Sequence, residues 1–217
     1  MIPKRKMKEL IFYKKVPVLL QQSPTYDIKK VLQIVEDRIP YQLVSGLDYM
    51  FVENSESMQD REIEATYRDG VIYLSPEIEN NEEAVLSIVH EIAHLVEEEH
   101  PYLYQDETIE TEFLGKRRKL ENILSVYGTD TSQHDFEKAE YCENFDDFLY
   151  LQVGYPVIRG LASGLFLSPY AATSVREYFA DAFEEYFIRE PRYVKLISPA
   201  VYFKIEELLD SLGENFL

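Results

Sequence analysis

Residues 80–97 read NNEEAVLSIVHEIAHLVE, and this stretch decides how the rest of the chain is interpreted. Asn80 is a preferred N-cap residue, and Glu83 follows at the spacing of a capping box, so a helix is predicted to begin here. Its apolar residues recur at helical spacing, which predicts one buried face. They are Ala84, Val85, Ile88, Val89, Ile92, Ala93 and Val96. The helix is expected to end before Pro101, because proline cannot continue it.

The same helix carries the pattern His-Glu-x-x-His at residues 90–94. His90 and His94 are about one turn apart, so both imidazoles project from one side and can bind one zinc ion. Glu91 lies beside them and can take a proton from a metal-bound water. The alternative is a helix that bears two histidines by chance. Its apolar neighbours predict burial, however, and burying these polar groups without a metal would be costly.

A catalytic zinc site also needs a third protein ligand and one open position. His100 follows His94 at the spacing of the metzincin pattern HExxHxxGxxH, but Glu97 stands where that pattern has glycine. On a continuing helix, six residues turn the chain by about 240° net, which would point His100 away from the metal. No methionine follows Met58, so the methionine turn of that group is also missing. His100 is therefore not the preferred third ligand.

Glu177 is the second candidate for the third ligand, on a helix predicted over residues 174–189. Glu177 and Asp181 are one turn apart, so one carboxylate could bind zinc while the other accepts the N–H of a ligand histidine. Ser174 and Glu177 also have the spacing of a capping box, and in that alternative Glu177 only caps the helix. The local pattern leaves both interpretations open.

The other segments predict an α+β fold, with a small N-terminal mixed sheet and a mainly helical C-terminal lobe. Helices are expected at residues 27–39, 108–127, about 133–152, 174–189 and 200–212. A strand is expected at residues 47–52, and the turn signal Asp69-Gly70 predicts a hairpin over residues 62–74. Residues 153–169 are rich in Gly and Pro and are expected to form loops.

The composition is that of a folded globular protein, with 46% hydrophobic and 29% charged residues in 217. The net charge of −18 disfavours binding to nucleic acid or to anionic membranes. We expect this charge to serve solubility, with a preference for basic peptide substrates as the alternative. Cys142 is the one cysteine, which excludes an intrachain disulfide and a thiolate zinc cluster. Its acidic neighbourhood disfavours a nucleophile, so we expect a structural role.

The N-terminal segment is basic over residues 1–6, as a signal peptide would be, but Lys14 and Lys15 interrupt the apolar run that follows. No stretch approaches 18 uninterrupted apolar residues, so no transmembrane helix is expected. The expected location is the cytoplasm, with export by a non-classical route as the alternative.

The two predicted helices together resemble a known family. The pattern at residues 90–94, followed by Glu177-Tyr178-Phe179-Ala180-Asp181-Ala182-Phe183, is similar to the gluzincins of the anthrax lethal factor catalytic domain group, which includes the secreted Pro-Pro endopeptidases. That family has HExxH on one helix and a glutamate ligand that opens an E-[YF]-F-A-[ED]-A-F helix. It also has a tyrosine seven residues before that glutamate, and residue 170 of this chain is Tyr170.

The resemblance implies a zincin-like fold, a single domain over residues 1–217 and zinc-dependent endopeptidase activity. The implied zinc ligands are His90, His94 and Glu177. Glu91 is implied as the general base, and Tyr170 as a donor to the oxyanion of the tetrahedral intermediate. For Tyr170 the alternative is a loop aromatic that covers the core. Asp181 is implied as the carboxylate that supports a ligand histidine.

The likeness covers residues 45–100 and 160–190, and residues 101–159 are interpreted as an inserted helical segment that frames or covers the substrate cleft. The strand ending at Leu74 resembles the edge strand on which zincins lay an extended substrate. The expected partner is a peptide or protein substrate; the oligomeric state is not predicted. Two alternatives stay open. One is a non-catalytic, zinc-stabilised binding module filled by residues 101–159, and the other is a phage-type regulatory protease that acts on a repressor.

Overall fold

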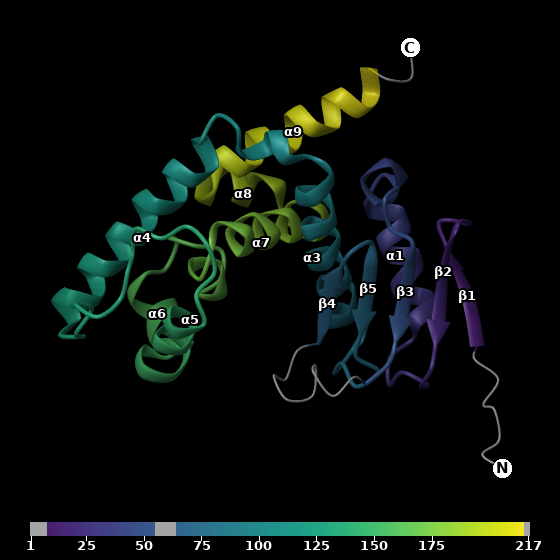
Figure 1. Ribbon diagram of the computed structural model, residues 1–217, viewed down its shortest axis with the longest axis horizontal. Coiled ribbons are helices and arrows are strands. Elements are labelled where there is room, and N and C mark those ends of the chain that lie inside the picture. The colour runs from purple at the N-terminus through teal and green to yellow at the C-terminus, as the bar shows by residue number, and fades with distance from the viewer. Residues whose placement is uncertain (1–7, 55–63, 215–217) are drawn as a thin grey trace. The chain divides into compact units, whose positions relative to one another are not determined.

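A computed structural model describes residues 8–54 and 64–214 of the chain (Figure 1). The chain forms two compact units, residues 1–99 and residues 100–217. The first contains the described strands and two long helices, and the second is helical. This mixture confirms the predicted α+β class, while the zincin-like fold and the single domain over residues 1–217 stay predictions.

The first unit contains one mixed sheet, formed by five strands among the described residues (Figure 1). Its elements are β1 (Lys8–Phe12), β2 (Val16–Leu20), α1 (Ile28–Arg38), η1 (Tyr41–Val44), β3 (Tyr49–Val52), β4 (Ala65–Arg68), β5 (Val71–Leu74) and α3 (Asn81–Glu99). The strand order is β1-β2-β3-β5-β4. The pairs β2–β3 and β3–β5 are parallel, and the two hairpins β1–β2 and β4–β5 are antiparallel.

One of the two hairpins was predicted from the sequence and the other was not. In β4–β5, Asp69 and Gly70 form the tight turn with positive φ angles of 48° and 77°, as expected, while residues 62 and 63 lie outside the described part. The turn between β1 and β2 also uses positive φ, at Tyr13 and Lys14. Neither is a residue type that signals such a turn, so the sequence pattern could not reveal this hairpin.

The position of β5 corrects one expectation. The strand ending at Leu74 was predicted to be an edge strand, but β5 lies between β3 and β4. Ile72 and Leu74 of β5 pair with Met50 and Val52 of β3, and all four side chains are buried. A strand between two neighbours buries its apolar side chains better than an edge strand does, which favours the interior position of β5. Among the described residues, the two edge strands are β4, next to β5, and β1 at the other side of the sheet.

Helix α3 supplies the core of the first unit. It packs beside α1 and against β4 and β5. Every residue of its predicted apolar stripe is at most 2% exposed, which confirms the predicted buried face. The opposite face of the sheet carries more exposed side chains, among them Phe51 and Tyr73, whose rings stack with centroids 5.6 Å apart. The HExxH pattern thus lies on a helix whose apolar face is packed in the core of this unit.

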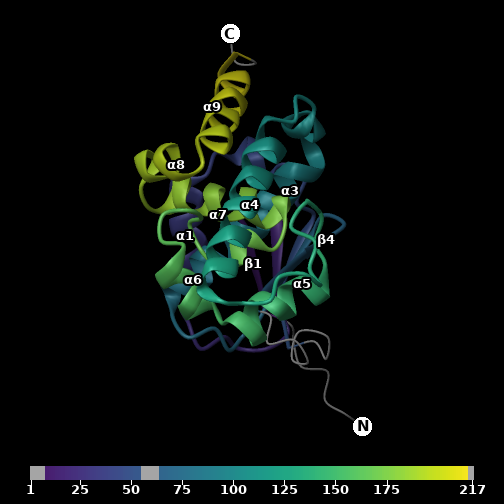
Figure 2. The same cartoon turned by 90° about the vertical axis from the view of Figure 1, so that its left-hand side faces the viewer.

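The second unit is built around α7, which packs against α4, α8, α9 and η4. Its elements are η2 (Pro101–Tyr104), α4 (Thr108–Tyr127), α5 (Glu143–Asp147), η3 (Phe148–Val153), α6 (Tyr155–Leu161), η4 (Tyr170–Ala172), α7 (Val175–Ile188), α8 (Pro191–Ile197) and α9 (Pro199–Glu214). The predicted helices at residues 108–127, 174–189 and 200–212 correspond to α4, α7 and α9. The short helix α8 was not predicted and lies next to α9 in both views (Figures 1 and 2).

Two further expectations on the second unit are wrong in part. The helix expected from about residue 133 begins only at Glu143, because the Asp130 and Asp135 side chains accept hydrogen bonds from backbone N–H groups two residues on and form local turns. The loop expected over residues 153–169 contains α6. Gly154 and Pro156, which suggested a loop, start this helix, because proline is well tolerated in the first helical turn.

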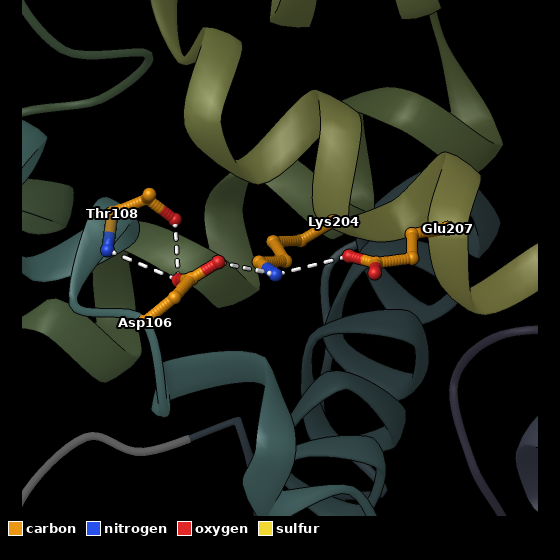
Figure 3. A network of polar contacts seen from close by, with 4 residues as sticks. All are labelled: Asp106, Thr108, Lys204 and Glu207. Carbon is orange, nitrogen blue, oxygen red and sulfur yellow. Dashed lines mark hydrogen bonds and ion pairs between the residues drawn. The ribbon is translucent and has the colours of Figure 1, made fainter.

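A polar network ties the start of α4 to α9 (Figure 3). The Lys204 ammonium on α9 lies 2.7 Å from the Asp106 carboxylate and 2.9 Å from the Glu207 carboxylate. Asp106 also accepts hydrogen bonds from the backbone N–H and the hydroxyl of Thr108, at 3.2 and 2.7 Å. One carboxylate therefore both stabilises the first turn of α4 and pairs with a lysine from a helix far along the chain.

Candidate metal centre

The first group of candidate residues lies on α3. The backbone N–H of Glu83 donates to the Asn80 side chain at 3.0 Å, which confirms Asn80 as the N-cap. His90 and His94 project from the same side of the helix with ring centroids 5.1 Å apart. Each offers a ring nitrogen, and these nitrogens lie within 4.8 Å of each other. Two neighbouring imidazoles of this kind are a ligand pair that zinc accepts.

Glu97 is a residue of this group that was not predicted as part of the site. Its Oε2 lies 2.8 Å from Nδ1 of His94, and the two side chains are only 4% and 12% exposed. The pair is three residues apart on one helix, so the two side chains are neighbours on its surface. This spacing can be read from the sequence, and it could have indicated the contact between His94 and Glu97.

Glu91 is 8% exposed, and its carboxylate contacts the sheet. Oε2 accepts a hydrogen bond of 2.6 Å from the backbone N–H of Tyr67 on β4. Arg68 and Val71 pair across the hairpin turn, so the N–H of Tyr67 points away from β5, toward the outer side of β4. The candidate general base therefore lies at the edge of the sheet.

The second group of candidate residues lies on α7. Ser174 is the N-cap, and its Oγ accepts the backbone N–H of Glu177 at 3.2 Å. This bond uses the backbone of Glu177 and is the one that the predicted capping box assigns to Ser174. Glu177, Asp181 and Glu184 are half-buried and follow one another at helical spacing. Carboxylate oxygens of Asp181 and Glu184 lie within 4.8 Å of each other, and Glu184 was not predicted.

Tyr170 lies in η4, directly before α7, and is half-buried. Burial raises the pKa of the Tyr170 hydroxyl well above its ordinary value, and the negative charges of Glu177 and Asp146 raise it further. The phenol therefore stays protonated at neutral pH and can donate a hydrogen bond. This is the property that an oxyanion donor needs.

Asp146, which affects Tyr170, comes from the segment interpreted as an insertion. Its two carboxylate oxygens accept hydrogen bonds from the hydroxyls of Tyr155 and Tyr141, at 2.7 and 2.9 Å. The part of residues 101–159 that holds this cluster thus contributes to the surroundings of Tyr170. No spacing rule could have revealed this, because Asp146 and Tyr170 belong to different elements.

His100 lies outside the HExxH helix. Helix α3 ends at Glu99, and His100 precedes η2 with its ring against Tyr102, centroids 5.6 Å apart. The helix therefore does not continue through His100, in line with the expected end before Pro101. That Glu177 rather than His100 completes a zinc site with His90 and His94 stays a prediction.

The residue types in both groups fit zinc, since imidazole nitrogens and carboxylate oxygens are its usual ligands beside thiolates. Comparison of the chain with protein-family models, with curated proteins and with solved structures gave no significant match. Over residues 8–54 and 64–214, no helix is both long enough and apolar enough to cross a membrane. A cytoplasmic location stays a prediction.

Proposed function

We propose that this protein is a zinc-dependent endopeptidase with a zincin-like fold, in which His90, His94 and Glu177 hold the metal. The observation that carries the proposal is on α3: two imidazoles have ring nitrogens within 4.8 Å of each other, and the next residue after His90 is the buried Glu91. A metallopeptidase helix has these residues: two histidines one turn apart that bind the metal, and a glutamate that acts as the base. The acidic face of α7 supplies the further ligand.

Each residue then has one chemical task. Zinc, when bound, lowers the pKa of a water molecule and polarises the scissile carbonyl. Glu91 takes the proton of the attacking water and passes it to the leaving amine. The hydroxyl of Tyr170 donates a hydrogen bond to the oxyanion that develops on the substrate carbonyl. Asp181 accepts the N–H of a ligand histidine.

The substrate is proposed to be a peptide or protein that binds in extended form along β4. Among the described residues, β1 and β4 are the two edge strands, and we propose β4 for strand addition because Glu91 lies beside it. The charge of −18 favours basic substrates over acidic ones. Nucleic acid is not an expected partner.

Metal analysis of the purified protein is the first test. We expect about one zinc ion per chain in the wild type, and loss of zinc in the His90→Ala and Glu177→Ala variants. Glu185→Ala, which removes a carboxylate of α7 that pairs with Arg189, is the matched control and should keep the metal. Wild-type zinc content in Glu177→Ala would mean that Glu177 is not the third ligand and that His100 or another residue is.

A second candidate function is a zinc-stabilised binding module without catalysis. The cluster of Asp146, Tyr141 and Tyr155 favours it, because residues of the segment 101–159 affect Tyr170. The two candidates differ in one measurement. The module predicts stoichiometric zinc but no cleavage of any peptide library, whereas the endopeptidase predicts cleavage that Glu91→Gln abolishes.

A further inference from the structure

We infer that Glu97 is a positioning residue for His94, which fixes the tautomer of its ring so that Nε2 is the nitrogen offered to the metal. The inference rests on the proposed function and deepens it. The carboxylate that supports a ligand histidine was predicted on α7, at Asp181, but His94 has such a partner on its own helix.

The geometry supports this role. Glu97 Oε2 and His94 Nδ1 are 2.8 Å apart, which is the distance of a strong, charge-assisted hydrogen bond. The Glu97 side chain is 4% exposed, and a carboxylate is rarely buried so deeply unless it is paired. Residues three apart on a helix meet without any help from the rest of the fold. The pair therefore exists as soon as α3 forms.

The chemistry follows from the donors and acceptors. An ionised carboxylate only accepts hydrogen bonds, so His94 must carry its hydrogen on Nδ1. In a neutral imidazole Nε2 then has the lone pair that a metal needs. Orienting partners of this kind usually change metal affinity by about 10–100-fold when they are removed. Glu97 thus prepares His94 for metal binding before the ion arrives.

The test measures zinc affinity by chelator competition and the tautomer of His94 by ¹⁵N NMR of the metal-free protein. Glu97→Ala should weaken zinc binding by about 10–100-fold and mix the two tautomers of His94. Glu97→Gln keeps the size of the side chain, but its amide can donate as well as accept, so the tautomer should be less strictly fixed and the loss of affinity smaller than in Glu97→Ala. Glu82→Ala removes one exposed carboxylate from the same helix and serves as the control. Circular dichroism verifies that each variant folds.

Two results would overturn the role of Glu97: an affinity in Glu97→Ala equal to that of Glu82→Ala, or an unchanged Nδ1–H tautomer of His94. Either would leave the zinc site itself standing. A wild-type protein that binds no zinc would instead refute the proposed function. Even then, the tautomer in the metal-free proteins decides whether Glu97 orients His94.

Discussion

The carboxylate of Glu91 accepts a 2.6 Å hydrogen bond from the backbone N–H of Tyr67, and this bond joins the HExxH helix to the edge strand of the sheet. Glu91 is almost fully buried, and this contact helps to orient its carboxylate. A general base must be held within hydrogen-bonding distance of the proton that it takes. The bond to β4 holds the carboxylate at the edge where an extended substrate is proposed to lie.

Glu91→Gln tests the catalytic role of this carboxylate. The amide oxygen can still accept the N–H of Tyr67, so we expect normal folding and normal zinc content. Without a base, peptide hydrolysis should fall by about 10²–10⁴-fold. The measurement is kcat on a cleaved library peptide, with zinc content determined on the same samples. Cleavage at the wild-type rate would remove Glu91 from the mechanism.

Tyr170→Phe tests the oxyanion donor. The ring remains and only the hydroxyl is lost, so zinc content should stay close to wild type. We expect kcat to fall by about 10²–10³-fold with little change in KM, because the donor acts on charge that develops in the transition state. Tyr150→Phe, at a tyrosine that is 56% exposed, should leave kcat unchanged. A Tyr170→Phe enzyme of full activity would favour the alternative of a loop aromatic that covers the core.

Lys116 should make the stability of the protein depend on pH in the alkaline range. Its ammonium donates to the backbone carbonyls of Leu165 and Ile197, and burial lowers its pKa from 10.5 to about 8. Between these values the unfolded chain binds a proton that the folded chain has lost. Because of Lys116, the free energy of unfolding should therefore rise as the pH increases from about 8 to 10.5. The slope is at most ~1.4 kcal/mol per pH unit.

Urea unfolding at several pH values between 8 and 10 measures this slope. Lys116→Met should remove the rise, while Lys138→Met, at an exposed lysine that does not affect the Lys116 pKa, should keep it. The variant should also be less stable at pH 8, because the two carbonyls lose their donor. Equal slopes in wild type and Lys116→Met would contradict the lowered pKa.

The network in Figure 3 predicts a second pH dependence, on the acid side. The hydrogen bond with Lys204, followed by those with Thr108, lowers the pKa of Asp106 from 3.8 to about 2. The folded chain keeps Asp106 ionised where the unfolded chain protonates it. This stability is thus present above pH 3.8 and is lost as the pH falls toward 2.

Asp106→Asn should lack this component of the acid unfolding curve. The effect should be small and should shrink in high salt, because the Asp106 side chain is 48% exposed and water and ions screen it. Asp147→Asn, an exposed aspartate on α5, is the control. A wild-type acid transition in Asp106→Asn, measured by circular dichroism at low salt, would show that the network adds nothing.

Local patterns predicted a large part of the fold. Helix α4 has the bounds that its apolar spacing predicted, and α7 begins at the Ser174 cap. These features depend on residues a few positions apart, so a repeat of 3.6 residues is enough to reveal them. The turn of the β1–β2 hairpin and the late start of α5 were not predicted, because no local pattern indicates them. Their residues carry no strong signal, or bond to nearby backbone groups instead of extending a helix.

The sequence by itself determined the HExxH helix, its buried stripe and the common direction of His90 and His94, because helical geometry sets all three. Tertiary structure alone decided that Glu91 meets Tyr67 on β4, that β5 is interior, and that Asp146 acts on Tyr170. Glu91 and Tyr67 are 24 positions apart in the sequence, and so are Asp146 and Tyr170. The third case is the order of the strands in the sheet. Such relationships depend on how apolar surfaces pack together, and no local period in the sequence encodes them.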